Sequence, residues 1–200
     1  MPHNETLEYY NTNAEEYIHG TVDVDFQETQ EGFLKYIPPR GRILDFGCGS
    51  GRDAKYFHAR GFEVDAVDGA EELCKRAAEY TGINVKQMLF SDLDTVEEYD
   101  GIWACASILH VSSSELWEVL LKMIKALKNG GIIYASFKYG EYEGLRNGRY
   151  FNDFTGISFI NYIEDMASVK ILELWTTGDV RPDRGDENWL NLILQKQDIH

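Results

Sequence analysis

The sequence has 200 residues, of which 44% are hydrophobic and 13% aromatic, and its formal net charge is −15. This composition provides enough apolar surface for one folded domain and excludes extensive disorder. The acidic charge opposes non-specific binding to nucleic acids and to anionic membranes, because both need clustered lysine and arginine. We therefore expect a single-domain cytoplasmic protein that binds neither nucleic acid nor membrane.

The cysteines and histidines indicate neither disulfides nor a metal site. The three cysteines lie far apart without CxxC spacing, and the five histidines show no spacing typical of metal ligands. The N-terminus lacks the basic and apolar regions of a signal peptide, and no apolar run is long enough to span a membrane. These features favour reduced thiols in the cytoplasm and no bound metal.

Two polar amphipathic helices are expected first, over residues 4–20 and 25–37, and Pro38-Pro39 ends the second. Neither helix would be stable alone, so each is expected to cover another part of the molecule. Tyr10 and Tyr17 are the side chains of the first helix that we expect to reach a ligand. They are equally well explained as half-buried packing residues.

Residues 43–53, ILDFGCGSGRD, are the most informative stretch. A short apolar strand runs into glycines at alternate positions, and a helix is expected over residues 51–60. Such glycines let the backbone turn sharply and approach a ligand, while the first N–H groups of the helix face the same space. Asp45 can hold this loop or meet a cationic ligand.

Two other interpretations of the loop remain. A nicotinamide- or flavin-binding turn has the spacing G-x-G-x-x-G, whereas the third glycine comes one residue earlier here. An ordinary glycine-rich turn without a ligand is the other possibility.

Strand and helix patterns alternate from this loop to residue 137. The expected elements are strands at 43–46, 62–67, 84–88, 101–106 and 132–137, with helices over 70–80 and 113–128. Residues 139–154 then show no clear period, a short helix is expected over 155–166, and strands are expected at 168–177 and 188–196. The prediction is an α/β fold with a doubly wound, mostly parallel seven-stranded sheet that ends in an antiparallel hairpin.

The run Asp45-Phe46-Gly47-Cys48-Gly49-Ser50-Gly51 resembles the acid-x-Gly-x-Gly-x-Gly loop of the class I S-adenosylmethionine-dependent methyltransferases. The resemblance covers residues 41–137 well and the terminal hairpin loosely. The segments FNDF and RPDRGDENWLNLIL are loosely similar to small bacterial methyltransferases of the tellurite-resistance type. The resemblance implies a helical lid over residues 1–40, a cofactor-binding core over 41–137, and a substrate-side insert and hairpin over 138–200.

The same resemblance implies S-adenosyl-L-methionine as the cofactor. Asp68, after the second strand, would accept hydrogen bonds from the ribose hydroxyls. Asp92 would accept from the adenine amino group while Leu93 covers the ring, and Ala106 and Ser107 would lie beside the amino-acid end. The expected cofactor-binding residues are Tyr17, Asp45, Phe46, Gly47, Cys48, Gly49, Gly51, Asp68, Gly69, Asp92, Leu93, Ala106 and Ser107.

Methyl transfer from a sulfonium is an in-line displacement that depends on orientation, and it needs a base only where the nucleophile carries a proton. His110 is the candidate base or orienting residue, and is equally explained as a structural histidine. Several residues of the irregular segments could bind an anionic acceptor, or could form surface ion pairs instead. They are Tyr10, Arg146, Arg149, Tyr150, Asn152, Arg181 and Arg184.

We expect the acceptor to be a small molecule. The segment ASILHV lacks the Asn-Pro-Pro-Tyr motif of enzymes that methylate amino groups of nucleic acids, which disfavours DNA bases and glutamine. A non-catalytic S-adenosylmethionine-binding regulator, or an enzyme with a protein or tRNA acceptor, remains an alternative. The sequence makes no prediction of the oligomeric state.

Overall fold

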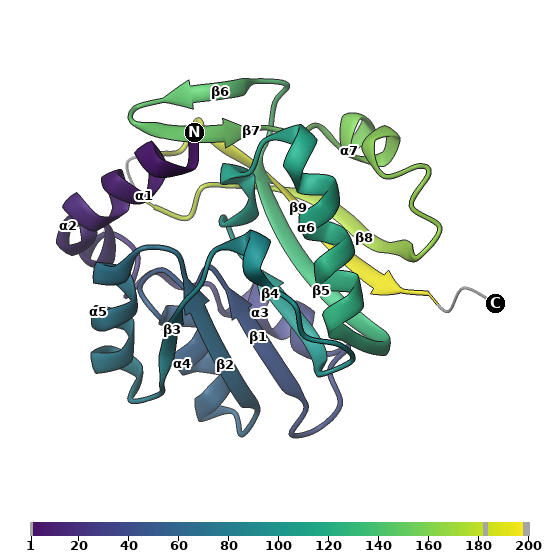
Figure 1. Ribbon diagram of the computed structural model, residues 1–200, viewed down its shortest axis with the longest axis horizontal. Helices are drawn as coiled ribbons and strands as arrows, with labels where there is room; N and C mark the ends of the chain where they lie inside the picture. Colours follow the sequence, from purple (N-terminus) through teal and green to yellow (C-terminus); the bar gives the residue numbers. More distant parts are fainter. Residues whose placement is uncertain (1, 182–183, 198–200) are drawn as a thin grey trace.

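A sheet of seven strands forms the centre of the computed structural model, which describes residues 2–181 and 184–197 (Figure 1). Its strands are β1 Arg42–Phe46, β2 Glu63–Asp68, β3 Val85–Gln87, β4 Tyr99–Ala104, β5 Leu127–Lys138, β8 Val169–Gly178 and β9 Asn188–Lys196. They follow the order β3-β2-β1-β4-β5-β9-β8, and β9 pairs antiparallel with both β5 and β8. The predicted mostly parallel sheet with a terminal antiparallel hairpin is confirmed.

Helices cover both faces of this sheet. They are α1 Pro2–Thr12, α2 Ala14–His19, α3 Gln27–Leu34, α4 Arg52–Ala59, α5 Glu71–Thr81, α6 Ser113–Ala126 and α7 Gly156–Tyr162. Side chains alternate across each strand, so Ile43 and Trp103 pack toward α3 and α4, while Leu44 and Ile102 pack toward α6 and α7. β4 is therefore buried on both faces, as its continuous apolar sequence predicts. Within the described residues, no helix is long and apolar enough to cross a lipid bilayer.

The first predicted helix is divided into α1 and α2. The break falls at Asn13, whose side chain donates to the Tyr9 carbonyl at 2.8 Å. The Tyr9 carbonyl therefore accepts from both the side chain and the backbone N–H of Asn13, and the structure has two helices where the sequence predicted one over residues 4–20.

Residues 139–154 also differ from the prediction, because they contain a second, two-stranded sheet. Its strands are β6 Glu143–Arg146 and β7 Arg149–Asn152. Asn147 and Gly148 join them with φ angles of 52° and 76°, which is the backbone of a tight two-residue hairpin turn. The Asn-Gly pair signals this turn, and it was overlooked because the flanking residues lack alternation.

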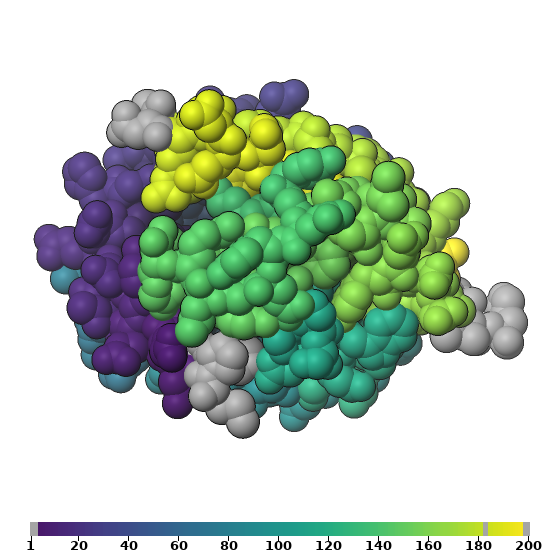
Figure 2. Space-filling model, turned by 90° about the horizontal axis from the view of Figure 1, so that it is seen from above, coloured from purple at the N-terminus to yellow at the C-terminus, as the bar shows by residue number. Residues whose placement is uncertain are grey.

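Three segments that are distant in the sequence meet at the carboxyl ends of the parallel strands. Seen from that end in Figure 2, the N-terminal helices, the β6–β7 hairpin and the loop between β8 and β9 lie side by side. A hydrogen bond from the Tyr150 N–H to Thr6 Oγ1 (2.9 Å) joins the hairpin to α1. These segments enclose the space beyond the glycine loop.

Candidate active site

The glycine loop follows β1 and has a left-handed backbone at each of its three glycines. Their φ angles are 89° at Gly47, 53° at Gly49 and 80° at Gly51, a region that side chains with a Cβ rarely adopt. A Cβ at Gly47 would lie 2.4 Å from Ser107 Cβ, and one at Gly49 would lie 2.8 Å from the Tyr17 hydroxyl. The loop therefore passes close beneath the end of β4 and the ring of Tyr17.

Asp68 ends β2 directly beside this loop. Its Oδ2 accepts a hydrogen bond from the Gly49 N–H and its Oδ1 accepts one from the Ala70 N–H, both at 2.9 Å. Burial raises the pKa of the Asp68 carboxyl, while the backbone donors of Ala70 and Gly49 act in the opposite direction. Each carboxylate oxygen has a second lone pair, so Asp68 can hold the loop and still accept from a ligand.

Two cavities lie on either side of the glycine loop. The first, which we call the β2 cavity, is lined among others by Leu7, Asp68, Gly69, Met88, Leu89 and Phe90. The second, which we call the β5 cavity, is lined among others by Cys48, Arg52, Lys138, Arg149, Phe151 and Trp189. Both are lined by Tyr10, Tyr17, Gly47, Ala106 and His110. An elongated ligand could thus extend over the loop from one cavity into the other.

His110 is positioned by two hydrogen bonds in the wall that the cavities share. Its Nδ1 lies 2.5 Å from the Tyr150 carbonyl oxygen, which can only accept, so Nδ1 carries the proton. The Nε2 of the neutral ring then accepts from the Tyr10 hydroxyl at 2.8 Å. Burial lowers the pKa of His110 to about 4. The ring is therefore neutral near pH 7, and its acceptor nitrogen is occupied by Tyr10.

The predicted acceptor-binding residues fall into two groups. Tyr10, Arg149, Arg181 and Arg184 line the β5 cavity. Outside the linings of both cavities are Arg146, which binds Asp153, Tyr150, which donates to Glu143, and Asn152, which donates to the Val111 carbonyl.

Some predicted cofactor-binding residues line neither cavity and instead pack against the elements that flank the loop. Asp45 is buried and accepts from the Ala54 N–H, and burial, reinforced by the nearby Asp53, raises the pKa of its carboxyl well above the usual range. The Phe46 side chain lies in the core, and Gly51 packs closely against Ala77 and Thr81 of α5. Of the two roles considered for Asp45, the geometry favours holding the loop.

Leu93 lies outside the linings of both cavities. Its side chain is 2% exposed and packs in the core with residues of α6. Asp92 is exposed and lies outside the linings of both cavities. The preceding residues Leu89, Phe90 and Ser91 line the β2 cavity instead, at the start of the short 3-10 helix Phe90–Asp92.

Sequence reasoning also missed two cationic residues of the β5 cavity. Arg52 directly follows the glycine loop, and Lys138 ends β5. Position alone could have indicated both, since residues at the carboxyl ends of parallel strands meet at one edge of the sheet. Within the described residues, no cluster of histidine, cysteine or carboxylate side chains is arranged to hold a metal ion.

The chain is similar in sequence to known methyltransferases. Residues 43–131 match the family model of a methyltransferase domain. An uncharacterized methyltransferase of Staphylococcus carnosus is 25% identical over 203 residues, which cover 96% of this chain and 94% of that protein. The chain is a class I S-adenosylmethionine-dependent methyltransferase.

Further comparisons agree with this family. The methyltransferase is 31% identical over 99 residues to the ubiquinone biosynthesis O-methyltransferase of Rickettsia conorii, of which it spans 34%. It shares its fold with the 1,6-didemethyltoxoflavin-N1-methyltransferase of Burkholderia thailandensis (TM-score 0.77, 20% identity), covering 96% of this chain and 85% of that one. That solved structure contains S-adenosylhomocysteine.

The site of the methyltransferase fits S-adenosylmethionine, the cofactor of this family. Both cavities reach the glycine loop at Gly47, and Gly49 and Asp68 line the β2 cavity. The adjoining β5 cavity provides room for a second molecule beside the first.

Proposed function

We propose that this protein transfers the methyl group of S-adenosylmethionine to a small-molecule acceptor in the β5 cavity. The observation that carries the proposal is the pair of cavities that meet at Gly47, Ala106 and His110, with the glycine loop between them. A cofactor across the loop and an acceptor in the β5 cavity would then be neighbours, as a displacement between them requires.

The proposed cofactor contacts follow from the lining of the β2 cavity. Asp68 would accept hydrogen bonds from the ribose hydroxyls, and Leu89 and Phe90 would contact the adenine ring. The amino-acid end would extend over Gly47 toward Arg52, which donates to Asp53 through Nε at 2.8 Å and Nη2 at 2.9 Å. The bound cofactor supplies an electrophilic methyl group on a sulfonium.

The residues of this chain would contribute orientation and exclusion of water. We propose that α1 and α2 act as the lid, because Tyr10 and Tyr17 contribute to the lining of both cavities. His110 would position the Tyr10 hydroxyl rather than remove a proton, since its Nε2 already accepts from Tyr10. The proposed reaction therefore suits an acceptor that reaches the site deprotonated, or that loses its proton to water.

A small acceptor is favoured over a protein or tRNA. Residues of α2, the β6–β7 hairpin and the loop between β8 and β9 line the β5 cavity, and these three segments lie side by side in Figure 2, as suits a small acceptor. The net charge of −15 also opposes a nucleic acid.

Transfer of a radiolabelled methyl group tests the proposal. The protein is incubated with labelled S-adenosylmethionine and a bacterial extract that has been separated into metabolite, RNA and protein fractions. We expect label to enter the metabolite fraction alone. Label in RNA or protein would contradict the small-molecule acceptor, and cofactor binding without transfer to any fraction would favour the regulatory alternative.

A further inference from the structure

The charge around the β5 cavity is opposite to that of the whole chain. The chain carries −15, yet the cavity is lined by Arg52, Lys138, Arg149, Arg181 and Arg184 against two acids, Asp53 and Asp179. Clefts lined by one sign of charge concentrate ligands of the opposite sign. This excess of positive charge is confined to the cavity, so the acidic partners of each cation decide how much of it a ligand could meet.

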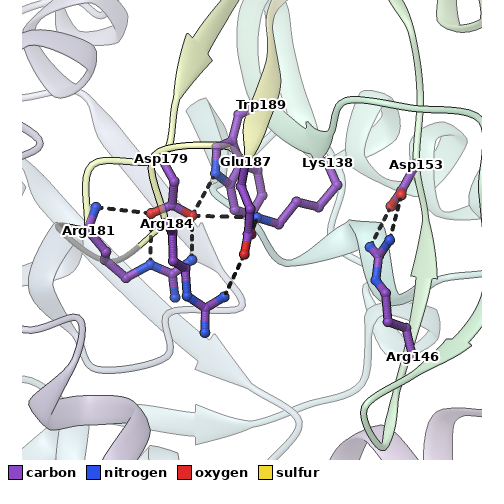
Figure 3. A network of polar contacts seen from close by, with 8 residues as sticks. All are labelled: Lys138, Arg146, Asp153, Asp179, Arg181, Arg184, Glu187 and Trp189. Carbon is purple, nitrogen blue, oxygen red and sulfur yellow. Dashed lines mark hydrogen bonds and ion pairs between the residues drawn. The ribbon is translucent and has the colours of Figure 1, made fainter.

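Four of these cations already have acidic partners. Arg52 pairs with Asp53, and Arg181 pairs with Asp179 at 2.5 Å. Lys138 contacts Asp179 and Glu187, and Arg184 lies 3.6 Å from Glu187, as Figure 3 shows. The loop between β8 and β9 is thus stabilised by its own ion pairs, which leaves little of this charge for a ligand.

Arg149, the fifth cation in the lining, differs from these four in its partners. Within the described residues its guanidinium makes no ion pair and lies among aromatic rings, 4.6 Å from the centre of Tyr9 and 5.1 Å from that of Phe151. Its Nε is buried without a hydrogen-bond partner. Buried donors in folded proteins are nearly always paired, so an unpaired one on a cavity wall indicates a ligand that completes it.

The neighbouring Arg146 shows what a structural arginine on this hairpin looks like. It lies directly opposite Arg149 across the β6–β7 pair, and its guanidinium is 4.4 Å from the centre of the Phe151 ring. Two hydrogen bonds of 3.1 Å join it to Asp153, so its charge is neutralised. Both arginines thus lie against Phe151, but Arg146 is paired with an acid outside the cavities, whereas Arg149 lines the β5 cavity without an acidic partner among the described residues.

We propose that Arg149 binds an anionic oxygen group of the methyl acceptor, a carboxylate or a phosphate. The inference rests on the proposed function, because it assigns the acceptor to the β5 cavity. Arginine forms charge-assisted hydrogen bonds with both groups, and its surroundings of Tyr9, Tyr10 and Phe151 suit an acceptor with a flat apolar body. The charge of Arg149, which has no acidic partner among the described residues, would favour entry of such an anion into an otherwise acidic protein.

Titration of the protein saturated with S-adenosylhomocysteine tests the inference without requiring turnover. The probes are indole-3-acetate, phenyl phosphate and the neutral indole-3-acetamide, and binding is followed by calorimetry. We expect at least one anion to bind about 10-fold more tightly than the amide, since charged hydrogen bonds exceed neutral ones. Which anion binds distinguishes the carboxylate from the phosphate.

Two substitutions of Arg149 and one control variant test whether Arg149 causes the preference for anions. Arg149→Gln should lose the preference for anions by about 10-fold, and Arg149→Lys should keep part of it because the charge remains. Arg146→Gln, the matched control, should bind the probes as the unmodified protein does. All should bind S-adenosylhomocysteine with unchanged affinity, and thermal melting shows whether each is folded.

The outcomes separate this inference from the proposed function. Equal binding of amide and anions, equal binding by Arg149→Gln, or no anion binding at millimolar concentration would overturn the role of Arg149. Weaker S-adenosylhomocysteine binding by Arg149→Gln would assign Arg149 to the cofactor instead and also overturn it. If S-adenosylhomocysteine does not bind the unmodified protein, the proposed function itself fails.

Discussion

Asp68 holds the glycine loop and lines a cavity with one side chain. The same carboxylate accepts from two backbone N–H groups and lines the β2 cavity. The sequence predicted this residue because its position, directly after a strand and beside the glycine loop, follows from local patterns. The burial of the Leu93 side chain was not predicted, because it depends on the packing of α6, which no local pattern reveals.

Replacing Asp68 by Asn should weaken binding of S-adenosylhomocysteine by about 10- to 100-fold, because hydrogen bonds to a charged group contribute about 1.5–3 kcal/mol. Calorimetry measures the dissociation constant, and thermal melting checks that the loop remains folded. Asp92→Asn is the matched control, since Asp92 is exposed outside both cavities. Equal losses in both variants would contradict the assignment of Asp68 to the ribose.

His110 should make stability depend on pH. Burial lowers its pKa from the usual 6.5 to about 4, so between these values the unfolded chain binds a proton that the folded protein does not. Stability should therefore fall as the pH falls through this range, with His110 contributing a loss of about 2 kcal/mol from about pH 7 to about pH 5.

Urea unfolding of the unmodified protein and of His110→Gln measures this contribution. The difference in the pH dependence of their unfolding free energies isolates the histidine. A parallel pH dependence in the two proteins would show that the ring is free to ionise in the folded state.

At the scale of elements, the sequence predicted the strand–helix alternation and the terminal hairpin but not the β6–β7 hairpin. Buried strands such as β4 carry a strong apolar signal, whereas β6 is half-exposed and β7 includes the polar residues Arg149 and Asn152. The β6–β7 hairpin nevertheless matters to the site, because it brings Arg149 to the cavity and fixes His110 through the Tyr150 carbonyl.

Ligand binding should stabilise the N-terminal helices. Tyr10 and Tyr17 contribute to the lining of both cavities, so a ligand there adds contacts to α1 and α2. Addition of S-adenosylhomocysteine should slow amide hydrogen exchange in these helices by about 10-fold or more, as measured by mass spectrometry. The amides of α7, which packs on the opposite side of the sheet from α3 and α4, should not change. Unchanged exchange in α1 and α2 would contradict their role as a lid.

At the scale of the molecule, net charge separates the acceptor classes. A chain of −15 should not bind RNA at physiological salt, since phosphate backbones require clustered cations and those of the β5 cavity are mostly paired. Fluorescence anisotropy with labelled tRNA should show no binding at micromolar protein. Micromolar binding that weakens steeply with salt would revive the tRNA acceptor.

The central claim is that one cofactor extends over the glycine loop between the two cavities, and a crystal structure with S-adenosylhomocysteine tests it most directly. We predict the ribose hydroxyls within hydrogen-bond distance of Asp68, adenine in the β2 cavity, and the sulfur directed toward the β5 cavity beside Arg149. A ligand bound elsewhere, or a sulfur that faces away from the β5 cavity, would contradict the account.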